Sequence, residues 1–155
     1  MVTSSVLPQV IDYLVSQLGT AMSPTPVYDG VGLSESGATT YVMVGAQDPN
    51  APADSEAGTS SFAFAALARG VNPKDESLTV YVTAVAWDGG GVQKTARDAA
   101  YTLASAAETS LRGDPSMGSL VLWSLVSATT LHQDQASYGA IAVVTMQITA
   151  RARLS

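Results

Sequence analysis

The longest alternation of apolar and polar residues in the chain begins at Ser77. Every second position is apolar, which places these residues on one buried face of a strand: Leu78, Val80, Val82, Ala84 and Ala86. The opposite face is mostly polar or aromatic: Thr79, Tyr81, Thr83 and Trp87. Gly89 to Gly91 then interrupt the alternation. The pattern predicts a long strand, buried on one face, that ends at a glycine hinge.

After these glycines the spacing of apolar residues becomes helical. One side of the predicted helix carries small and apolar residues: Ala96, Ala99, Leu103, Ala106, Ala107 and Ser110. The other side carries Lys94, Asp98, Tyr101, Ser105, Glu108 and Arg112. Because Gly113 favours a helix stop and Pro115 prevents continuation, the pattern predicts a helix from Val92 to Arg112. It places Leu103 between helix and sheet, and Glu108 and Arg112 in a surface ion pair.

A second amphipathic helix is predicted near the N-terminus. Apolar residues recur at three-and-four spacing on one face: Val6, Leu7, Val10, Ile11, Leu14, Val15 and Leu18. Ser4 or Ser5 can cap its N-terminus, and Pro8 suits the first turn because its missing N–H is no loss there. Gly19 is the expected end of the helix.

Between the helices the sequence predicts three short strands and a loop. The strands are Val27 to Asp29, ended by Gly30, then Thr40 to Val44, and Ser61 to Leu67 with Phe62 and Phe64 on one face. The run near residues 46–60, from Gln47 to Ser60, lacks periodicity and is rich in small and polar residues. We expect an exposed, mobile loop there, either functional or a simple insertion.

The C-terminal part predicts an antiparallel hairpin. Its strands run from Ser119 to Leu131 and from Tyr138 to Arg153, joined by a turn from His132 to Ser137. In the last strand Tyr138, Ala140, Ala142, Val144, Met146, Ile148 and Ala150 share one face. The whole order predicts one domain over residues 1–155 with an α+β fold, a mainly antiparallel sheet with two helices packed on one face.

Composition narrows the classes of function. Charged residues make up only 13% of the chain, about half of the usual share of roughly 25%. Such a weakly charged surface favours burial against other subunits. The net charge of −6 disfavours contact with phosphate backbones, and the absence of cysteine excludes disulfides and thiolate metal sites. We find no signal peptide or membrane-spanning pattern, so we expect synthesis in a cytoplasm and no membrane partner.

The sequence offers weak candidates for catalysis or metal binding. His132 is the sole histidine and falls in a predicted polar turn beside Gln133 and Asp134, where histidines are usually solvated. The loop carboxylates Asp48, Asp54 and Glu56 lack the spacing of a calcium loop. Asp75 and Glu76 are adjacent on a strand and point to opposite faces, so they cannot easily share a proton, and Asp75 fits the end of the Asn72-Pro73-Lys74 turn.

A glycine-rich segment before a helix is also the location of phosphate-binding loops. Gly89 to Gly91 lack the dinucleotide fingerprint and the Lys-Ser/Thr ending of a P-loop, so a turn is the simpler interpretation. Trp87 and Trp123 suit either a core or an interface. We therefore predict no catalytic residue, no metal and no cofactor, and a protein that acts through its surfaces.

The chain as a whole resembles the tail terminator proteins of long-tailed siphophages, particularly those of actinobacterial phages. The resemblance rests on the order and spacing of motifs that are individually generic. These are Leu7-Pro8-x-Val10-Ile11, Val27-Tyr28-Asp29-Gly30, Lys74-Asp75-Glu76-Ser77-Leu78-Thr79-Val80, Gly89-Gly90, Ala96-Arg97-Asp98-Ala99, Leu111-Arg112-Gly113-Asp114-Pro115 and Tyr138-Gly139-Ala140. The loop from Gln47 to Ser60 departs from the compact family pattern.

The resemblance implies a function. In that family six copies close into a ring on the tail tube, stop its polymerisation and present the surface that joins the tail to the head. It implies a homo-hexamer in the virion, assembled in the host cytoplasm, with the tail tube protein and a head-completion or connector protein as partners. DNA would pass through the lumen without specific binding. The family motifs define no contact residues. A head–tail connector or other neck protein, and a small α+β enzyme or ligand-binding domain, remain alternatives.

Overall fold

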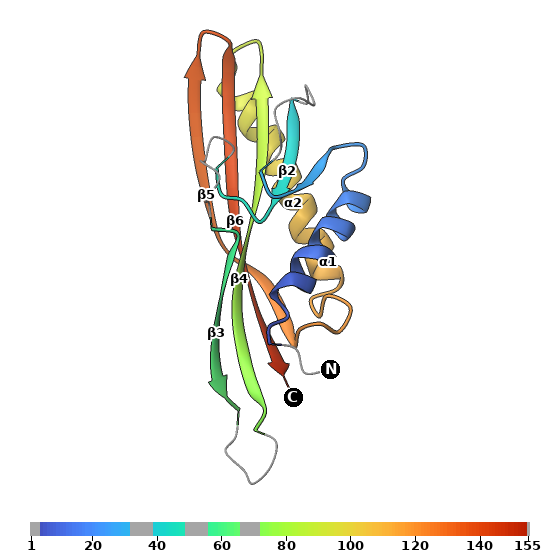
Figure 1. Cartoon of the computed structure of the whole chain (residues 1–155). Helices are drawn as coiled ribbons and strands as arrows, with labels where there is room; N and C mark the ends of the chain where they lie inside the picture. The colour runs from blue at the N-terminus through green and yellow to red at the C-terminus, as the bar shows by residue number, and fades with distance from the viewer. Residues whose placement is uncertain (1–3, 32–38, 49–55, 66–71, 155) are drawn as a thin grey trace.

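The computed structural model describes residues 4–31, 39–48, 56–65 and 72–154. These residues form an α+β fold with two helices and a six-stranded, mostly antiparallel sheet. The helices are α1 (Leu7–Ala21) and α2 (Gln93–Gly113). The strands are β1 (Val27–Asp29), β2 (Thr40–Val44), β3 (Gly58–Phe64), β4 (Lys74–Asp88), β5 (Trp123–Ala136) and β6 (Gly139–Leu154). Figure 1 shows a long, twisted sheet with the helices beside it.

The long strand β4 organises the sheet. Its register with β6 is antiparallel and continuous, from Lys74 opposite Leu154 to Asp88 opposite Ala140. The strand order is β1-β2-β4-β6-β5, with β3 also paired to β4. β5 and β6 form the predicted hairpin. The alternation that begins at Ser77 therefore belongs to a strand with neighbours along both edges.

β2 and β3 lie one after the other along the same edge of β4. β2 pairs with the second half of β4 and β3 with the first half. Between them, the N–H of Gly45 donates to the carbonyl of Tyr81, and the N–H of Tyr81 donates to the carbonyl of Ala57. The chain thus leaves this edge after Gly45 and returns to it at Ala57, and one residue of β4 binds both ends of the excursion.

The main core lies between the helices and one face of the sheet. It joins buried residues of α1 (Val10, Leu14, Leu18), of α2 (Ala96, Ala100, Ala104, Ala107, Leu111) and alternate residues of β4 and β6, including Leu78, Val80, Val82, Val144, Met146 and Ile148. We call this the helix side of the sheet and the other side the outer face. The small residues of α2 let that helix lie close to the sheet.

β4 supplies an acceptor for the N-terminus of each helix. The carboxylate of Glu76 accepts from the N–H of Val6, and that of Asp88 accepts from the N–H of Val92, both at 2.8 Å. Val6 and Val92 are the N-cap residues, and neither has a side chain that can cap. Carboxylates are favoured at helix N-termini because the unpaired N–H groups create a positive potential. Two acidic residues of one strand therefore fix where both helices begin.

The helices differ from the sequence predictions in three details. The helix α1 continues through Gly19 to Ala21. At its N-terminus the hydroxyl of Ser5 accepts from the N–H of Leu7, as predicted for a serine cap. The distant carboxylate of Glu76 supplies a second cap by accepting from the N–H of Val6. In α2 the buried stripe is centred on Ala100 and Ala104, and Leu103 at its flank is only partly buried. The bounds of α2 and the Glu108–Arg112 pair are close to those predicted.

The strands agree with prediction except near their ends. β1 and β2 have the predicted bounds, whereas β3 begins at Gly58, so the last three residues of the predicted loop are paired with β4. The hairpin turn contains only Ser137 and Tyr138, and β5 extends through His132 to Ala136, because the pairing with β6 continues to Ala136 opposite Gly139. Tyr138 lies in this turn and is exposed, outside the buried face of β6.

Candidate functional site

The segment after β2 crosses the outer face of the sheet. Two threonines hold it there: the hydroxyl of Thr83 donates to the carbonyl of Ala46 at 2.6 Å, and the hydroxyl of Thr145 donates to the carbonyl of Gln47 at 3.0 Å. Beneath this segment a second, smaller apolar cluster contains Met43, Ala46, Val85 and Val143. The outer face is therefore covered locally, although neither helix of the described residues packs on this cluster.

A pocket of about 380 Å³ lies beside this crossing segment. Its lining comes from four parts of the chain: Gln47 and Asp48, Tyr81 of β4, Thr130, His132, Gln133 and Asp134 of β5, and Ile141, Val143, Thr145 and Gln147 of β6. The volume falls within the range of small-molecule and side-chain pockets. We call it the outer-face pocket.

An irregularity in β5 determines which side chains reach this pocket. The pairing with β6 shifts between Val126 and Ala128, which is a bulge at Ser127. The hydroxyl of Ser127 lies 2.7 Å from that of Thr149 and holds the bulge to β6. Since an extra residue reverses which positions face outward, the bulge sets His132 opposite Val143 on the outer face.

Acidic groups dominate the charge of the pocket. Asp48 and Asp134 contribute carboxylates, and the lining residues within the described ranges include no Lys or Arg. Burial raises the pKa of Tyr81, and the nearby carboxylate of Glu56 raises that pKa further by its charge and a hydrogen bond. The tyrosine therefore stays neutral near pH 7. The pocket combines an apolar floor at Ile141 and Val143 with a negative, hydrogen-bonding rim.

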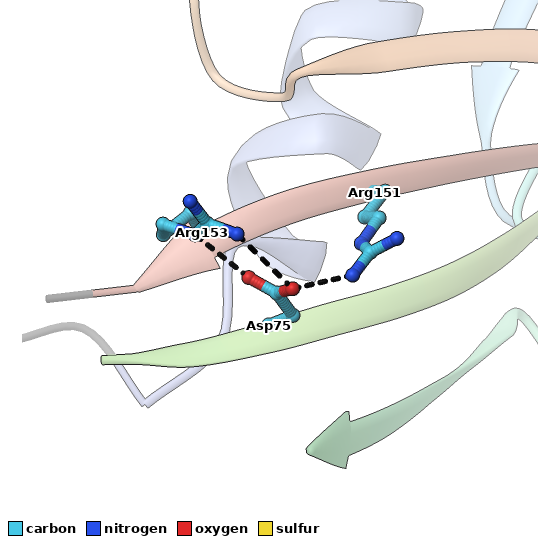
Figure 2. Close-up of polar contacts among 3 residues, drawn as sticks. All are labelled: Asp75, Arg151 and Arg153. Carbon is cyan, nitrogen blue, oxygen red and sulfur yellow. Dashed lines mark hydrogen bonds and ion pairs between the residues drawn. The ribbon is translucent and has the colours of Figure 1, made fainter. Parts of the chain in front are cut away.

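A charged cluster occupies the other end of the outer face. Figure 2 shows Arg151 and Arg153 of β6 pointing toward the carboxylate of Asp75 on β4. Arg153 donates through Nε at 2.9 Å, and Arg151 donates through Nη2. These hydrogen bonds, with that of Arg153 the strongest, lower the pKa of Asp75 from 3.8 to about 2. Asp75 is thus a strand residue with two cationic partners, contrary to the prediction that it ends a turn.

Large exposed hydrophobic side chains gather at two borders of the sheet. On the border formed by β3, Phe62 and Phe64 are 49% and 66% exposed. They lie on the helix side, because they pair with Glu76 and Lys74 of β4. On the border formed by β5, Leu122, Trp123 and Leu125 are exposed. These two surfaces are apolar areas that the described part of the fold leaves open to solvent.

The structure separates the sequence-derived candidate residues. His132 is an exposed strand residue of the pocket, Asp75 is bound to arginines, and Glu76 is fully buried at the start of α1. Trp87 and Trp123 are both partly exposed. Asp54 lies outside the described residues. In the described ranges no group of three or more His, Cys, Asp or Glu side chains is arranged to hold a metal ion.

The segment from Gly89 to Gly91 is a turn, as expected. The N–H of Gly91 bonds to the carbonyl of Asp88, and the Asp88 carboxylate takes the N–H of Val92 at the start of α2. The Asp88 carboxylate therefore occupies the place at the helix N-terminus where a phosphate-binding loop would hold its anion. Neither helix in the described residues has both the length and the apolar character needed to cross a membrane.

Sequence reasoning missed two features of the sheet, one on each face. The outer-face pocket joins residues that are far apart in the chain, and no local pattern identifies it. The buried position of Glu76 could have been recognised, because it is in phase with Leu78 and Val80 on the apolar face of the strand. An acidic residue at such a position needs hydrogen-bond donors from elsewhere in the fold.

Known proteins add no identification. No protein-family model matches the chain, and a search of curated proteins finds no match.

Proposed function

We propose that this protein is a tail terminator of a long-tailed bacteriophage. Six copies would form a ring on the last ring of the tail tube, stop polymerisation of the tube and provide the surface that joins the head. The proposal begins from the resemblance in order and spacing of the sequence motifs. Its partners are further copies of itself, the tail tube protein and a head-completion or connector protein, and its place is the tail–head junction of the virion.

The observation that supports the proposal best is the pair of separate apolar surfaces. Phe62 and Phe64 lie on the β3 border, and Trp123 and Leu125 lie on the β5 border of the same sheet. A ring needs a contact with the next copy, and a cap needs a further surface for its partner, so two separate apolar surfaces suit these two tasks. The low content of charged residues suits burial of such surfaces.

The charge of the chain suits a channel for DNA. A lumen through which the genome passes should not bind phosphates tightly, because each bound phosphate would retard the movement of the strand. The net charge of −6, with seven Lys and Arg residues in 155, supports weak interaction with DNA. We therefore place DNA in the lumen without specific binding.

The proposal is tested in a phage that lacks the gene. We expect intact heads and tails of abnormal length by electron microscopy, because nothing halts tube growth or completes the joint. Purified protein should be hexameric at high concentration, or become hexameric on added tail tubes. Tails of normal length in the mutant phage, or a monomer that never assembles on tubes, would contradict the proposal. Co-purification with heads instead of tubes would favour a connector or other neck protein.

The outer-face pocket favours a second candidate, a ligand-binding domain or small enzyme. His132 and Asp134 stand two residues apart on the same face of β5 within a pocket of about 380 Å³. Complementation of the mutant phage with His132→Ala separates the candidates, since a cap needs no general base. Failure of a well-folded, ring-competent His132→Ala protein to restore tails would favour the enzyme.

A further inference from the structure

We infer that side chains from the last residues of β3 and the first residue of β4 of one copy dock in the outer-face pocket of the next copy. We call the docking group the aromatic tip and define it as Phe62, Phe64 and Lys74. The inference rests on the proposed ring and names its subunit contact. The tip and the pocket would then form the two different halves of one heterologous interface.

The aromatic tip combines apolar area with a positive charge. The rings of Phe62 and Phe64 are about half and two thirds exposed. The ammonium group of Lys74 lies 4.3 Å from the centroid of the Phe62 ring and donates to the carbonyl of Ser4. Aromatic side chains with a cation beside them are typical anchors of protein interfaces, because they bury a large area at a low cost in conformational entropy.

The pocket has the complementary chemistry. Its floor at Ile141 and Val143 offers apolar contact for a phenyl ring, and its rim carries the exposed carboxylate of Asp134. A lysine that approaches with the rings would meet a negative potential. Opposite charges across an interface guide association and exclude wrong partners.

The positions of the two surfaces favour contact between copies. Along β4 and β6 the tip lies where Lys74 pairs with Leu154, and the pocket reaches the other end, where Trp87 pairs with Ile141. The tip also faces the helix side, whereas the pocket opens on the outer face. One copy therefore cannot fill its own pocket. Copies that overlap end to end, the helix side of one on the outer face of the next, can do so repeatedly and close a ring.

Cross-linking tests the contact directly, because the chain contains no cysteine. Phe64→Cys and Thr130→Cys proteins are mixed and oxidised, and a disulfide dimer of one copy of each is expected. A single protein that carries both Phe64→Cys and Thr130→Cys should give a series of disulfide-linked oligomers of up to six copies. Ser105→Cys on the exposed side of α2 replaces Thr130→Cys in the control and should give no dimer above background. Equal yields in both mixtures would overturn the inference.

Charge reversal gives a second test. Lys74→Glu and Asp134→Lys should each raise the concentration needed for half-maximal ring formation by about tenfold. The protein with both substitutions should form rings at a concentration close to that of the wild type. Lys94→Glu, on the exposed side of α2, should leave ring formation unchanged. Thermal unfolding of every variant shows that the fold is intact. Additive losses in the double reversal would contradict direct contact between Lys74 and the pocket.

The outcomes separate this inference from the proposed function. Hexameric rings without the specific cross-link would overturn the tip-to-pocket contact and leave the terminator proposal standing. An unassembled protein, alone and on tail tubes, would overturn both. A cross-link that forms only in dimers, and never beyond two copies, would favour an isologous pair of molecules and contradict a ring built on this contact.

Discussion

The side-chain carboxylate of Glu76 accepts a hydrogen bond from the backbone N–H of Val6 at 2.8 Å, across 70 positions of sequence. The hydroxyls of Ser5 and Ser60 donate to the same carboxylate, so a fully buried charge has three donors. Such satisfaction is needed because a buried carboxylate without partners would be strongly unfavourable. The contact joins α1, β3 and β4 at one point.

Replacement of Glu76 by Gln should therefore destabilise the fold. The amide keeps the size of the side chain but loses the charge and turns one acceptor into a donor that faces other donors. We expect the free energy of unfolding to fall by about 1.5 to 3 kcal/mol in chemical denaturation. The control is Ser77→Ala on the exposed position next to it, which should change stability by less than about 0.5 kcal/mol. Equal effects would show that Glu76 has no special role in stability.

Acidification should weaken the cluster around Asp75. Its pKa in the folded protein is about 2, below the ordinary value of 3.8, because Arg153 and Arg151 bind the ionised form. A lowered pKa contributes stability that is complete above about pH 5 and is lost as the pH falls through 3.8 and then 2. The stability of the wild type should thus fall more steeply between pH 4 and pH 2 than that of Asp75→Asn. Urea unfolding at several pH values measures both slopes.

Asp12→Asn, on the exposed side of α1, serves as the control for this experiment and should keep the wild-type slope. Parallel curves for the wild type and Asp75→Asn would contradict the assignment of this pH dependence to Asp75.

The stability lost on alanine substitution at three positions of α2 should follow how deeply each side chain is buried. Leu111 is 4% exposed, Leu103 is partly buried at the flank of the stripe, and Lys94 lies on the solvent side. Leu111→Ala should cost about 2 to 5 kcal/mol because it leaves a cavity in the core. Leu103→Ala should cost less, and Lys94→Ala under about 0.5 kcal/mol. A larger loss of stability for Leu103→Ala than for Leu111→Ala in thermal or chemical unfolding would show that the buried stripe of α2 is assigned incorrectly.

Two glycines should respond oppositely to alanine. Gly139 begins β6 with φ of 137°, and a Cβ there would lie 2.4 Å from the carbonyl oxygen of Asp88. Gly139→Ala should therefore lower the free energy of unfolding by about 1 to 3 kcal/mol. Gly113 ends α2, and a Cβ there would have no atom within 4 Å. Gly113→Ala should leave stability unchanged or raise it by up to about 1 kcal/mol. A stable Gly139→Ala protein would refute the close contact.

Local sequence patterns predicted most of the elements and few of their ends. The strand that begins at Ser77 and the face of β6 formed by Ala140 to Ala150 followed from strict alternation. The stripe of α2 was misplaced by one position, since Ala99 and Ala100 are the same residue type and hydrophobicity cannot distinguish them. The ending of α1 at Ala21 instead of Gly19 reflects the weak local preference of a single glycine.

The pocket and the helix caps could not be predicted in this way. Glu76 and Val6, or Tyr81 and His132, come together only through the pairing of strands that lie far apart in the chain. The turn expected around His132 was wrong for a similar reason. Polar residues from His132 to Gln135 resemble a loop, yet pairing with β6 satisfies their backbone groups and keeps them in a strand.

The two backbone bonds of Tyr81 make the excursion between β2 and β3 a natural site for grafting. Gly45 and Ala57 are held side by side by the carbonyl and the N–H of one strand residue, so the ends of the segment stay fixed whatever its length. The entropic cost of a longer loop grows only slowly, by about 0.6 kcal/mol for each doubling. A peptide epitope or a fluorescent domain introduced between Asp48 and Glu56 should therefore leave the pairing of β2 and β3 with β4 intact.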